Sequence, residues 1–326
     1  MSTIYDVARK AAVSTYTVSS ELNQSAYVSP ELTRRVQEAV RELDYTINDL
    51  ARGLQTRKTK TVGMLIPDLA NPFYAKVLRG VENVLKESGF SLILGDTNNR
   101  HEEQSRYLAV FRSKQVDGLL LFISPGDDRE VRALVKARKP VVFVGRTPID
   151  LRADSVSADN LKGVQMAVAH LMSKGHKRIA LVNGQEGLSS SADRATGWKR
   201  ALKKGGLSVS KQRLSHEDWT ADSGYAATLR FLDQRERPTA IFAANFLMMT
   251  GVLKALKERR LRCPADVEVM SSDDSEWLDV FEPRISTVAQ PSYEMGAKAA
   301  QLLLKRIQTP GRRFEQIVLE PELTIR

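Results

Sequence analysis

The sequence has few of the residues on which disulfide-bonded domains, metal sites and most enzymes depend. Its 326 residues include a single cysteine, Cys263, which excludes an internal disulfide framework and suits a reducing cytoplasm. The four histidines are scattered, and there is no metal-spaced His/Cys cluster, glycine-rich phosphate loop or Ser/His/Asp set. We therefore predict no metal, no cofactor and no enzymatic activity. We expect His176, in a turn before a strand, to be solvated.

Long hydrophobic runs are also missing. The apolar run at residues 118–123 has the length of a strand and is far shorter than the roughly 20 residues that cross a membrane. The first helix is predicted to begin at residue 4, which leaves no room for the charged and apolar regions of a leader. We expect no signal peptide, no membrane partner and a cytoplasmic location.

The net charge of +10 favours a polyanionic partner, but its placement is more informative than its size. Residues 1–60 contain nine Lys and Arg against seven Asp and Glu, so this segment carries a net charge of only +2. Within residues 52–60, however, there are four basic residues and no acidic one. This local run supports binding to nucleic acid better than the total does.

Three short helices are predicted in the first 45 residues. Residues 4–11 carry apolar side chains at i, i+3, i+4 and i+7, and Thr3 can cap the helix. A short turn separates this helix from a second one at residues 15–22. Ser29 and Pro30 form the usual start of a third helix. Two short helices joined by a turn and supported by a third place a recognition helix in the DNA major groove.

From residue 61 onward, strand-like and helix-like segments alternate. Strands are predicted at residues 61–67, 91–95, 118–123, 140–144, 178–182, 240–243 and 267–270, and helices at 72–88, 104–113, 129–137, 159–173 and 192–204. Such alternation predicts parallel sheets with helices on both faces, in two series of which the second begins near residue 159. Ligands of doubly wound sheets bind beyond the carboxyl ends of the strands.

Motifs along nearly the whole chain resemble those of the lac-repressor (LacI/GalR) family of transcriptional regulators. The matching segments, in order, are Thr3-Ile4-Tyr5-Asp6-Val7-Ala8, Val13-Ser14, Thr17-Val18-Ser19, Leu22-Asn23, Ala51-Arg52-Gly53-Leu54, Ile66-Pro67-Asp68, Asn71-Pro72-Phe73, Asp159-Asn160, Gly175-His176-Lys177-Arg178-Ile179, Thr239-Ala240-Ile241-Phe242-Ala243-Ala244-Asn245 and Thr287-Val288-Ala289-Gln290-Pro291. One short motif would be weak support, but head, hinge and core motifs occur together.

The resemblance implies an α/β protein with an all-α head. It implies a helix–turn–helix headpiece at residues 1–46, a hinge helix and linker at 47–60, and two Rossmann-like lobes of periplasmic-binding-protein type, at 61–160 with 291–319 and at 161–290 with 320–326. The implied function is repression by a homodimer that binds pseudo-palindromic, double-stranded operator DNA under the control of a small-molecule effector, a sugar or related metabolite. No leucine heptad tail follows the core, which favours a dimer over a tetramer.

The headpiece positions implied to meet DNA are mostly polar. Thr15, Tyr16 and Ser20 match the family's specificity positions, and none of them can make a bidentate contact with guanine or adenine. The remaining DNA-binding residues implied by the resemblance are Thr3, Tyr5, Ser14, Thr17, Ser19, Asn23, Ser29, Asn48, Ala51, Arg52 and Leu54. Two departures from the family pattern are Ala12, at a turn position often held by glycine, and the acidic Glu21 on the recognition helix.

Residues 48–55 read as a helix of about two turns with Asn48 as its cap. So short a helix is marginal in water, and Gly53 weakens it further. In the family, two such hinge helices pair in the minor groove and a leucine from each wedges between central base steps, and Leu54 matches that leucine. More of the sequence discrimination would then depend on DNA deformability. Alternatively, the segment is a tether whose Leu54 packs on the core.

The effector site is implied to lie in the cleft between the lobes. Its predicted residues are Phe73, Tyr74, Ser190, Arg194, Trp219, Asn245, Phe246, Asp273 and Gln290. Asp, Arg and Asn side chains together bind vicinal hydroxyls through paired hydrogen bonds, and an indole can stack on a sugar ring or a base. Phe246 departs from the family, since relatives commonly place a carboxylate after the asparagine.

Other interpretations of these residues stay open. Trp219 and Phe73 could equally be packing residues, Asp273 could belong to a turn, and Arg194 could be a surface charge at a helix start. The effector could be a nucleoside or nucleobase, or Phe246 could have removed the response to any effector. An enzyme would turn over a ligand in the cleft, and a periplasmic binding protein would need a signal peptide; the sequence supports neither.

Overall fold

The computed structural model describes residues 2–23, 25–45 and 58–326, which form two compact units at residues 1–59 and 60–326. The predicted hinge helix at 48–55, with Asn48, Ala51, Arg52 and Leu54, lies outside the described residues. Among the described residues no helix is both long and apolar enough to span a membrane.

The first unit contains the three predicted helices, α1 (Ile4–Ala11), α2 (Thr15–Asn23) and α3 (Pro30–Glu42). Thr3 and Asp6 form a capping box at the start of α1, and the Ser29 side chain caps α3. Buried apolar side chains from all three helices form one small core: Val7, Ala8, Ala11, Val18, Val36 and Ala39. The predicted helix–turn–helix arrangement is therefore confirmed.

The turn between α1 and α2 contains Ala12, at the position where relatives often have glycine. Ala12 has a φ of +50°, in the left-handed region that glycine occupies without a steric penalty. Its carbonyl accepts a hydrogen bond from Arg35 Nη2 at 3.0 Å, which ties the turn to α3. Alanine is thus accommodated where relatives use glycine, and the turn keeps its shape.

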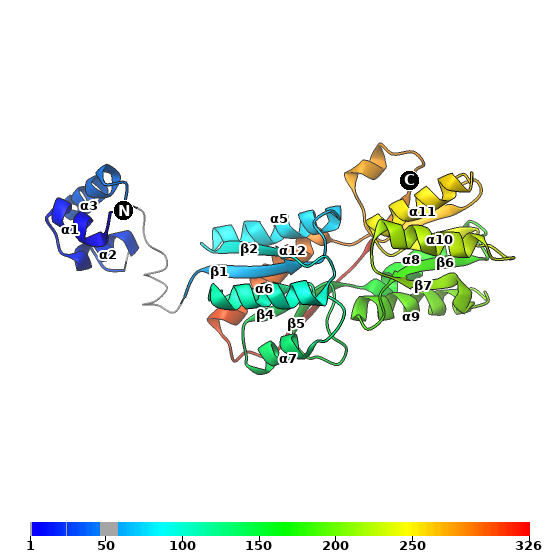
Figure 1. Ribbon diagram of the computed structural model, residues 1–326, viewed down its shortest axis with the longest axis horizontal. Coiled ribbons are helices and arrows are strands. Elements are labelled where there is room, and N and C mark those ends of the chain that lie inside the picture. Colours follow the sequence, from blue (N-terminus) through cyan, green and yellow to red (C-terminus); the bar gives the residue numbers. More distant parts are fainter. Residues whose placement is uncertain (1, 24, 46–57) are drawn as a thin grey trace. The chain divides into compact units, whose positions relative to one another are not determined.

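The second unit contains two six-stranded sheets (Figure 1). The first sheet has the order β11-β5-β4-β3-β1-β2, and the second has the order β12-β10-β9-β8-β6-β7. The strands are β1 (Thr61–Ile66), β2 (Ser91–Asp96), β3 (Gly118–Leu121), β4 (Val141–Val144), β5 (Asp154–Ala158), β6 (Ile179–Gly184), β7 (Leu214–Glu217), β8 (Ala240–Ala243), β9 (Glu268–Ser271), β10 (Ser286–Ala289), β11 (Gln316–Leu319) and β12 (Glu322–Thr324).

All paired strands run parallel except β10 and β12, which pair antiparallel. The chain passes from one sheet to the other after β5, after β10 and after β11. The helices are α5 (Pro72–Glu87), α6 (His101–Ser113), α7 (Arg129–Lys136), α8 (Asn160–Ser173), α9 (Ser189–Lys204), α10 (Ala221–Leu232), α11 (Phe246–Glu258) and α12 (Ser292–Gln308).

Each sheet is covered by helices on both faces, because alternate residues of its strands point to opposite sides. On β1, Met64 joins a core with α5 and α12, whereas its neighbour Leu65 joins a core with α6 and α7. On β6, Ala180 packs with α10 and α11, whereas Leu181 packs with α8 and α9. The structure therefore confirms the predicted pair of doubly wound lobes.

The prediction that His176 is solvated is wrong. Its side chain is only 18% exposed, and its two ring nitrogens lie 3.1 Å from Thr239 Oγ1 and 2.9 Å from Glu268 Oε2. Lys174 Nζ also lies 2.5 Å from Glu268. The cluster stands at the amino ends of β6, β8 and β9, so it stabilises the edge of the second sheet that is opposite the cleft.

Candidate functional site

The exposed face of the headpiece carries part of the predicted DNA-binding set. Tyr5 and Tyr16 are 69% and 72% exposed, an unusual state for large aromatic side chains. Ser14 Oγ accepts the backbone N–H of Thr17 at 3.1 Å and lies 2.9 Å from its hydroxyl, so both residues take part in the cap of α2. Both tyrosines are therefore aromatic side chains that the headpiece can offer to DNA, and Tyr27, after α2, is exposed as well.

Ser20 does not fit the prediction that it reads DNA. It is only 3% exposed. A buried hydroxyl cannot reach a base edge, so this assignment is corrected. Thr3 and Ser29 are engaged as helix caps, Thr15 and Ser19 are half-buried, and the side chain of Asn23 is outside the described part of the chain.

The acidic Glu21 is turned away from the exposed face. Its Oε2 accepts a hydrogen bond from Thr33 Oγ1 at 2.8 Å, and its Oε1 accepts one from Gln37 Nε2 at 3.1 Å. The carboxylate therefore joins α2 to α3 inside the headpiece, where it does not need to approach a phosphate. This contact explains an acid that is out of place on a DNA-reading helix.

The carboxyl ends of strands from both sheets meet around a small cavity of about 40 Å³. Its lining residues are Asn71, Phe73, Tyr74, Phe122, Gly145, Arg146, Ser190, Arg194, Trp219, Ala244, Asn245, Asp273 and Gln290. Of the nine predicted effector residues, all but Phe246 line this cavity. We call these lining residues the cleft site.

Asp273 follows β9 and is the carboxylate of the cleft site. It is 4% exposed, and its oxygens accept hydrogen bonds from the Phe246 backbone N–H at 3.2 Å, from Gln290 Nε2 at 3.0 Å and from Asn71 Nδ2 at 3.4 Å. Burial raises the pKa of Asp273, while the positive charge of Arg194 partly opposes that rise. The neighbouring Asp274 instead contacts Thr287 and Arg326, so Asp273 alone serves the cleft.

Two buried arginines line the same cavity as this carboxylate. Arg194 and Arg146 are 4% and 5% exposed, and their guanidinium carbons lie 5.4 and 5.7 Å from the Trp219 ring centroid. Burial lowers the pKa of Arg194 to about 10. Arg194 Nε and Nη1, Arg146 Nε and Trp219 Nε1 are buried donors without a hydrogen-bond partner among the described residues. Buried N–H groups normally donate a hydrogen bond, so these four atoms are available to donate to acceptor atoms of a ligand.

Arg194 is placed differently from what the sequence predicted. Helix α9 begins at Ser189 rather than at Ala192, so Arg194 lies in its second turn and points into the protein. The interpretation as a surface charge at a helix start is therefore wrong. Ser190, in the first turn, is also buried beside the cavity.

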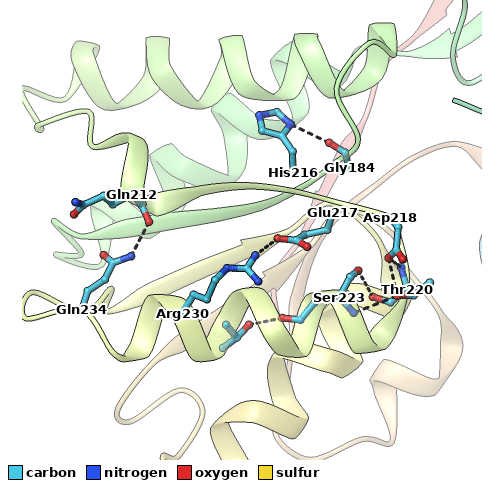
Figure 2. A network of polar contacts seen from close by, with 11 residues as sticks. Gly184, Gln212, His216, Glu217, Asp218, Thr220, Ser223, Arg230 and Gln234 are labelled. Carbon is cyan, nitrogen blue, oxygen red and sulfur yellow. Dashed lines mark hydrogen bonds and ion pairs between the residues drawn. The ribbon is translucent and has the colours of Figure 1, made fainter. Parts of the chain in front are cut away.

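Trp219 stands in a loop whose backbone is held on both sides. Asp218 Oδ1 accepts hydrogen bonds from the Thr220 hydroxyl and N–H, and Thr220 in turn caps α10 through Ser223 (Figure 2). On β7, His216 Nδ1 lies 3.0 Å from the Gly184 carbonyl, at the end of β6 (Figure 2). These contacts fix the loop that carries the indole.

The backbone of Trp219 itself is strained. Its φ is +74°, a genuine outlier for a bulky residue, and its carbonyl accepts a hydrogen bond from Asn245 Nδ2 at 3.0 Å. Strain of this kind costs about 1–3 kcal/mol and is typical of functional sites. Trp219 packs against core residues of both lobes and also lines the cavity.

We expect Gly184→Ala to disturb the cleft through Trp219. A Cβ at position 184 would lie 1.8 Å from the Trp219 ring, so the indole must move. The expected result is a shifted tryptophan fluorescence spectrum and weaker effector binding, with operator binding retained. Gly311→Ala is the control for an added methyl group, since nothing lies within 4 Å of its Cβ position and its φ is outside the left-handed region. Equal spectra for Gly184→Ala and the unchanged chain would contradict this assignment.

The first lobe contributes an aromatic wall. The ring centroids of Phe73 and Tyr74 lie 5.1 Å apart, and that of Phe122 lies 6.2 and 5.0 Å from them, all in edge-to-face geometry. Burial raises the pKa of Tyr74 to about 12. Phe73 belongs both to the core of this lobe and to the cleft lining, and Phe122 was missed from the sequence because it reads as part of a strand run.

Phe246 does not line the cleft. It is the first residue of α11, and its side chain packs against the core between α10 and α11 while its backbone N–H donates to Asp273. The prediction that Phe246 belongs to the effector-binding residues is therefore corrected, since the cavity lining does not include it. Asn245 caps α11 through Met248 N–H at 2.7 Å and holds Trp219, so it positions the site as well as lining it.

Sequence reasoning missed Arg146 and Asn71. Arg146 follows β4 by two residues, so the rule that ligands bind beyond the carboxyl ends of the strands could have found it. Asn71 caps α5 through Phe73 N–H and reaches across the cleft to Asp273. A second cross-lobe hydrogen bond runs from the Thr147 N–H to Ser189 Oγ at 3.0 Å. The lobes thus touch directly, around a cavity too small for a monosaccharide.

No group of three or more metal-ligating side chains that could hold an ion occurs in the part of the chain that the structure describes. The cleft site is a set of hydrogen-bond donors and one carboxylate around an indole.

Comparisons with known proteins agree with this division into head and core. The family model for bacterial regulatory proteins of the lacI family matches residues 3–48, and that for a periplasmic binding protein-like domain matches residues 168–326. Catabolite control protein A of Priestia megaterium is 36% identical over 304 residues, which cover 93% of this chain and 92% of that protein.

Two solved structures are similar over the full length of the chain. The transcriptional regulator CelR in complex with cellobiose is 33% identical with a TM-score of 0.76, covering 100% of this chain and 99% of that one. A lac repressor dimer bound to operator and the anti-inducer ONPF is 27% identical with a TM-score of 0.87, covering 100% and 98%. The family expected from the motifs is confirmed, and the chain belongs to the lacI family of bacterial regulatory proteins.

Proposed function

We propose that the chain is a cytoplasmic transcriptional repressor without catalytic activity, which binds its operator as a homodimer and responds to a sugar in the cleft site. The observation that carries the effector assignment is Arg194. It is buried, its guanidinium makes no hydrogen bond with a described residue, and it lies beside Trp219 and near the charge of Asp273. A ligand with several oxygen acceptors would satisfy it.

A sugar fits this donor set better than a nucleobase. The cleft offers orphan N–H donors on Arg194, Arg146 and Trp219 and one carboxylate acceptor, Asp273, which matches a ring bearing several hydroxyls. A relative with full coverage, CelR, is in complex with cellobiose. Phe246 packs against the core and is absent from the cavity lining, which supports a retained response to the effector.

The mechanism follows from how the lobes are joined. Three chain segments cross between the sheets, and direct contacts such as Asn71 to Asp273 close the cleft. A sugar can enter only when the lobes separate, so its binding changes their relative position. In a dimer this would move the points from which the two hinges start, and so couple the cleft to operator affinity. Induction and co-repression use this scheme with opposite sign.

The DNA-binding part of the proposal is tested at Leu54. We expect Leu54→Ala to lower operator affinity and to reduce DNA bending, because the wedge that opens the central base step would be lost. Electrophoretic mobility of operator fragments with the site at different positions measures both quantities. Unchanged affinity together with unchanged bending would show that the segment is only a tether.

The effector part is tested by a thermal-shift screen of sugars and nucleosides. We expect sugars to raise the melting temperature of the full chain and Arg194→Met to lose the rise. Trp198 is fully buried in the core of the second lobe and does not line the cleft, so Trp198→Phe is a packing control that should keep the rise. A rise with nucleosides only would favour the nucleobase alternative.

A further inference from the structure

A second and larger cavity, of about 620 Å³, lies at the opposite end of the first sheet. It stands at the amino ends of three neighbouring parallel strands, β4, β5 and β11, whereas the cleft site stands at the carboxyl ends. The loop after α12 closes one side and the end of α7 another. Its lining residues are Val135, Arg138, Lys139, Val141, Arg152, Ala153, Arg306, Pro310, Gly311, Arg312, Arg313, Phe314 and Gln316, and we call it the amino-edge cavity.

The lining of this cavity has six basic residues and no acidic one. Two of the six are neutralised, since Arg306 pairs with Asp154 and Arg312 with Glu315. The other four make no ion pair with any described residue: Arg138, Lys139, Arg152 and Arg313. Four unpaired cations around one concavity repel one another, so an anion bound there would be stabilised by all of them.

Three further features of the lining restrict the chemical class of ligand that fits this cavity. Arg312 Nη1 is buried and has no hydrogen-bond partner among the described residues, although the other terminal nitrogen of this guanidinium is paired. Phe314 is 50% exposed, and the Arg306 guanidinium carbon lies 5.0 Å from its ring centroid. The apolar side chains of Val135, Val141 and Ala153 line the same space.

We propose that the amino-edge cavity binds an organic phosphate of the nucleotide class. The four unpaired cations and the buried Arg312 nitrogen call for a group with at least two negative charges and several acceptor oxygens, as in a di- or triphosphate. The half-exposed Phe314 and the apolar lining call for a flat ring on the same molecule. A neutral sugar would leave the charge uncompensated, and inorganic phosphate would leave the aromatic ring unused.

This site is independent of the effector site proposed above. Strand β4 separates the two, because Lys139 precedes it and Arg146 follows it. The amino-edge cavity is therefore a second ligand-binding site, and it lies on the first lobe. The phosphates of operator DNA share the same chemistry, and the experiment distinguishes duplex DNA from a free nucleotide.

The test is calorimetric titration of the full-length chain with ATP, adenosine and inorganic pyrophosphate. We expect one ATP per chain, weaker pyrophosphate binding and no detectable adenosine binding. The double variant Arg152→Glu/Arg313→Glu should lose at least about tenfold in ATP affinity, since it removes two charged hydrogen-bond donors. Phe314→Ala should weaken ATP but leave pyrophosphate binding unaltered.

Arg200→Glu/Lys203→Glu, two exposed basic residues on α9, is the matched control with the same change of charge. It should bind ATP as the unchanged chain does. If both double variants lost the same ATP affinity, the effect would come from net charge alone, and the proposal would be overturned. It would also be overturned if the chain without substitutions bound no ATP. Loss of ATP binding in Asp273→Ala would place the nucleotide in the cleft instead. If the unchanged chain bound no ATP and Arg152→Glu/Arg313→Glu lowered operator affinity, the surface would bind DNA instead. That result would also contradict the proposal.

Discussion

Asp273→Ala is expected to abolish the effect of the sugar on operator binding while operator affinity without the sugar stays nearly unchanged. The carboxylate is buried, accepts three hydrogen bonds and is the acidic side chain that lines the cleft site. Removing a buried charged partner costs about 2–5 kcal/mol, so sugar affinity should fall by at least about thirtyfold. Fluorescence anisotropy of a labelled operator, with and without sugar, measures both affinities.

Asp274→Ala is the matched control for this prediction. Asp274 is the next residue, but its carboxylate contacts Thr287 and Arg326 rather than the cleft. This variant should keep the response to the sugar even if it melts at a lower temperature. If both variants lost the response equally, the loss would reflect damage to this edge of the second lobe, and the assignment of Asp273 to the ligand would be wrong.

The second large effect is expected at Arg306, in the first lobe. Its side chain is 5% exposed, pairs with the fully buried Asp154 at 2.7 Å and donates to the carbonyls of Pro310, Arg312 and Arg313. Arg306→Met should lower the free energy of unfolding of the second unit by about 3–5 kcal/mol, because Asp154 would remain as a buried, unpaired charge. Urea denaturation followed by circular dichroism measures this loss.

Two comparisons separate the buried pair from ordinary surface charge. Replacing both partners, as Asp154→Leu/Arg306→Met, should recover part of the loss, because no lone buried charge then remains. Arg259→Met breaks the more exposed pair with Asp233 and should cost less than about 1 kcal/mol. A cost for Arg306→Met as small as that for Arg259→Met would refute the proposed role of the buried pair.

Many of the residues that line the cleft site were predicted from the family resemblance, and a rule of the fold explains why they lie together. Side chains that follow parallel strands gather at one edge of the sheet, and Asp273 and Asn245 both follow strands of the second sheet. Arg194 also lines the cavity, but its place in the helix was mispredicted, because α9 begins three residues earlier than its apolar pattern indicates. Boundaries of helices depend on caps and tertiary contacts that the local pattern does not contain.

The errors have a common physical cause, namely that side-chain direction depends on packing between distant segments. Phe246, the first residue of α11, packs against the core of the second lobe, and Ser20 on α2 is only 3% exposed. The contact of Asn71 with Asp273 joins residues 202 positions apart. The position of the Glu21 carboxylate likewise depends on its hydrogen bonds to α3, which the sequence of α2 alone does not reveal.

The central claim is that the cleft site and the operator are thermodynamically coupled through the dimer. The most direct measurement is the affinity of the sugar for the full-length chain, determined by calorimetry in the absence and in the presence of saturating operator DNA. Coupling requires that operator changes sugar affinity by the same factor by which sugar changes operator affinity, and such factors typically lie between about 5 and 150. Equal sugar affinities with and without operator would contradict the account.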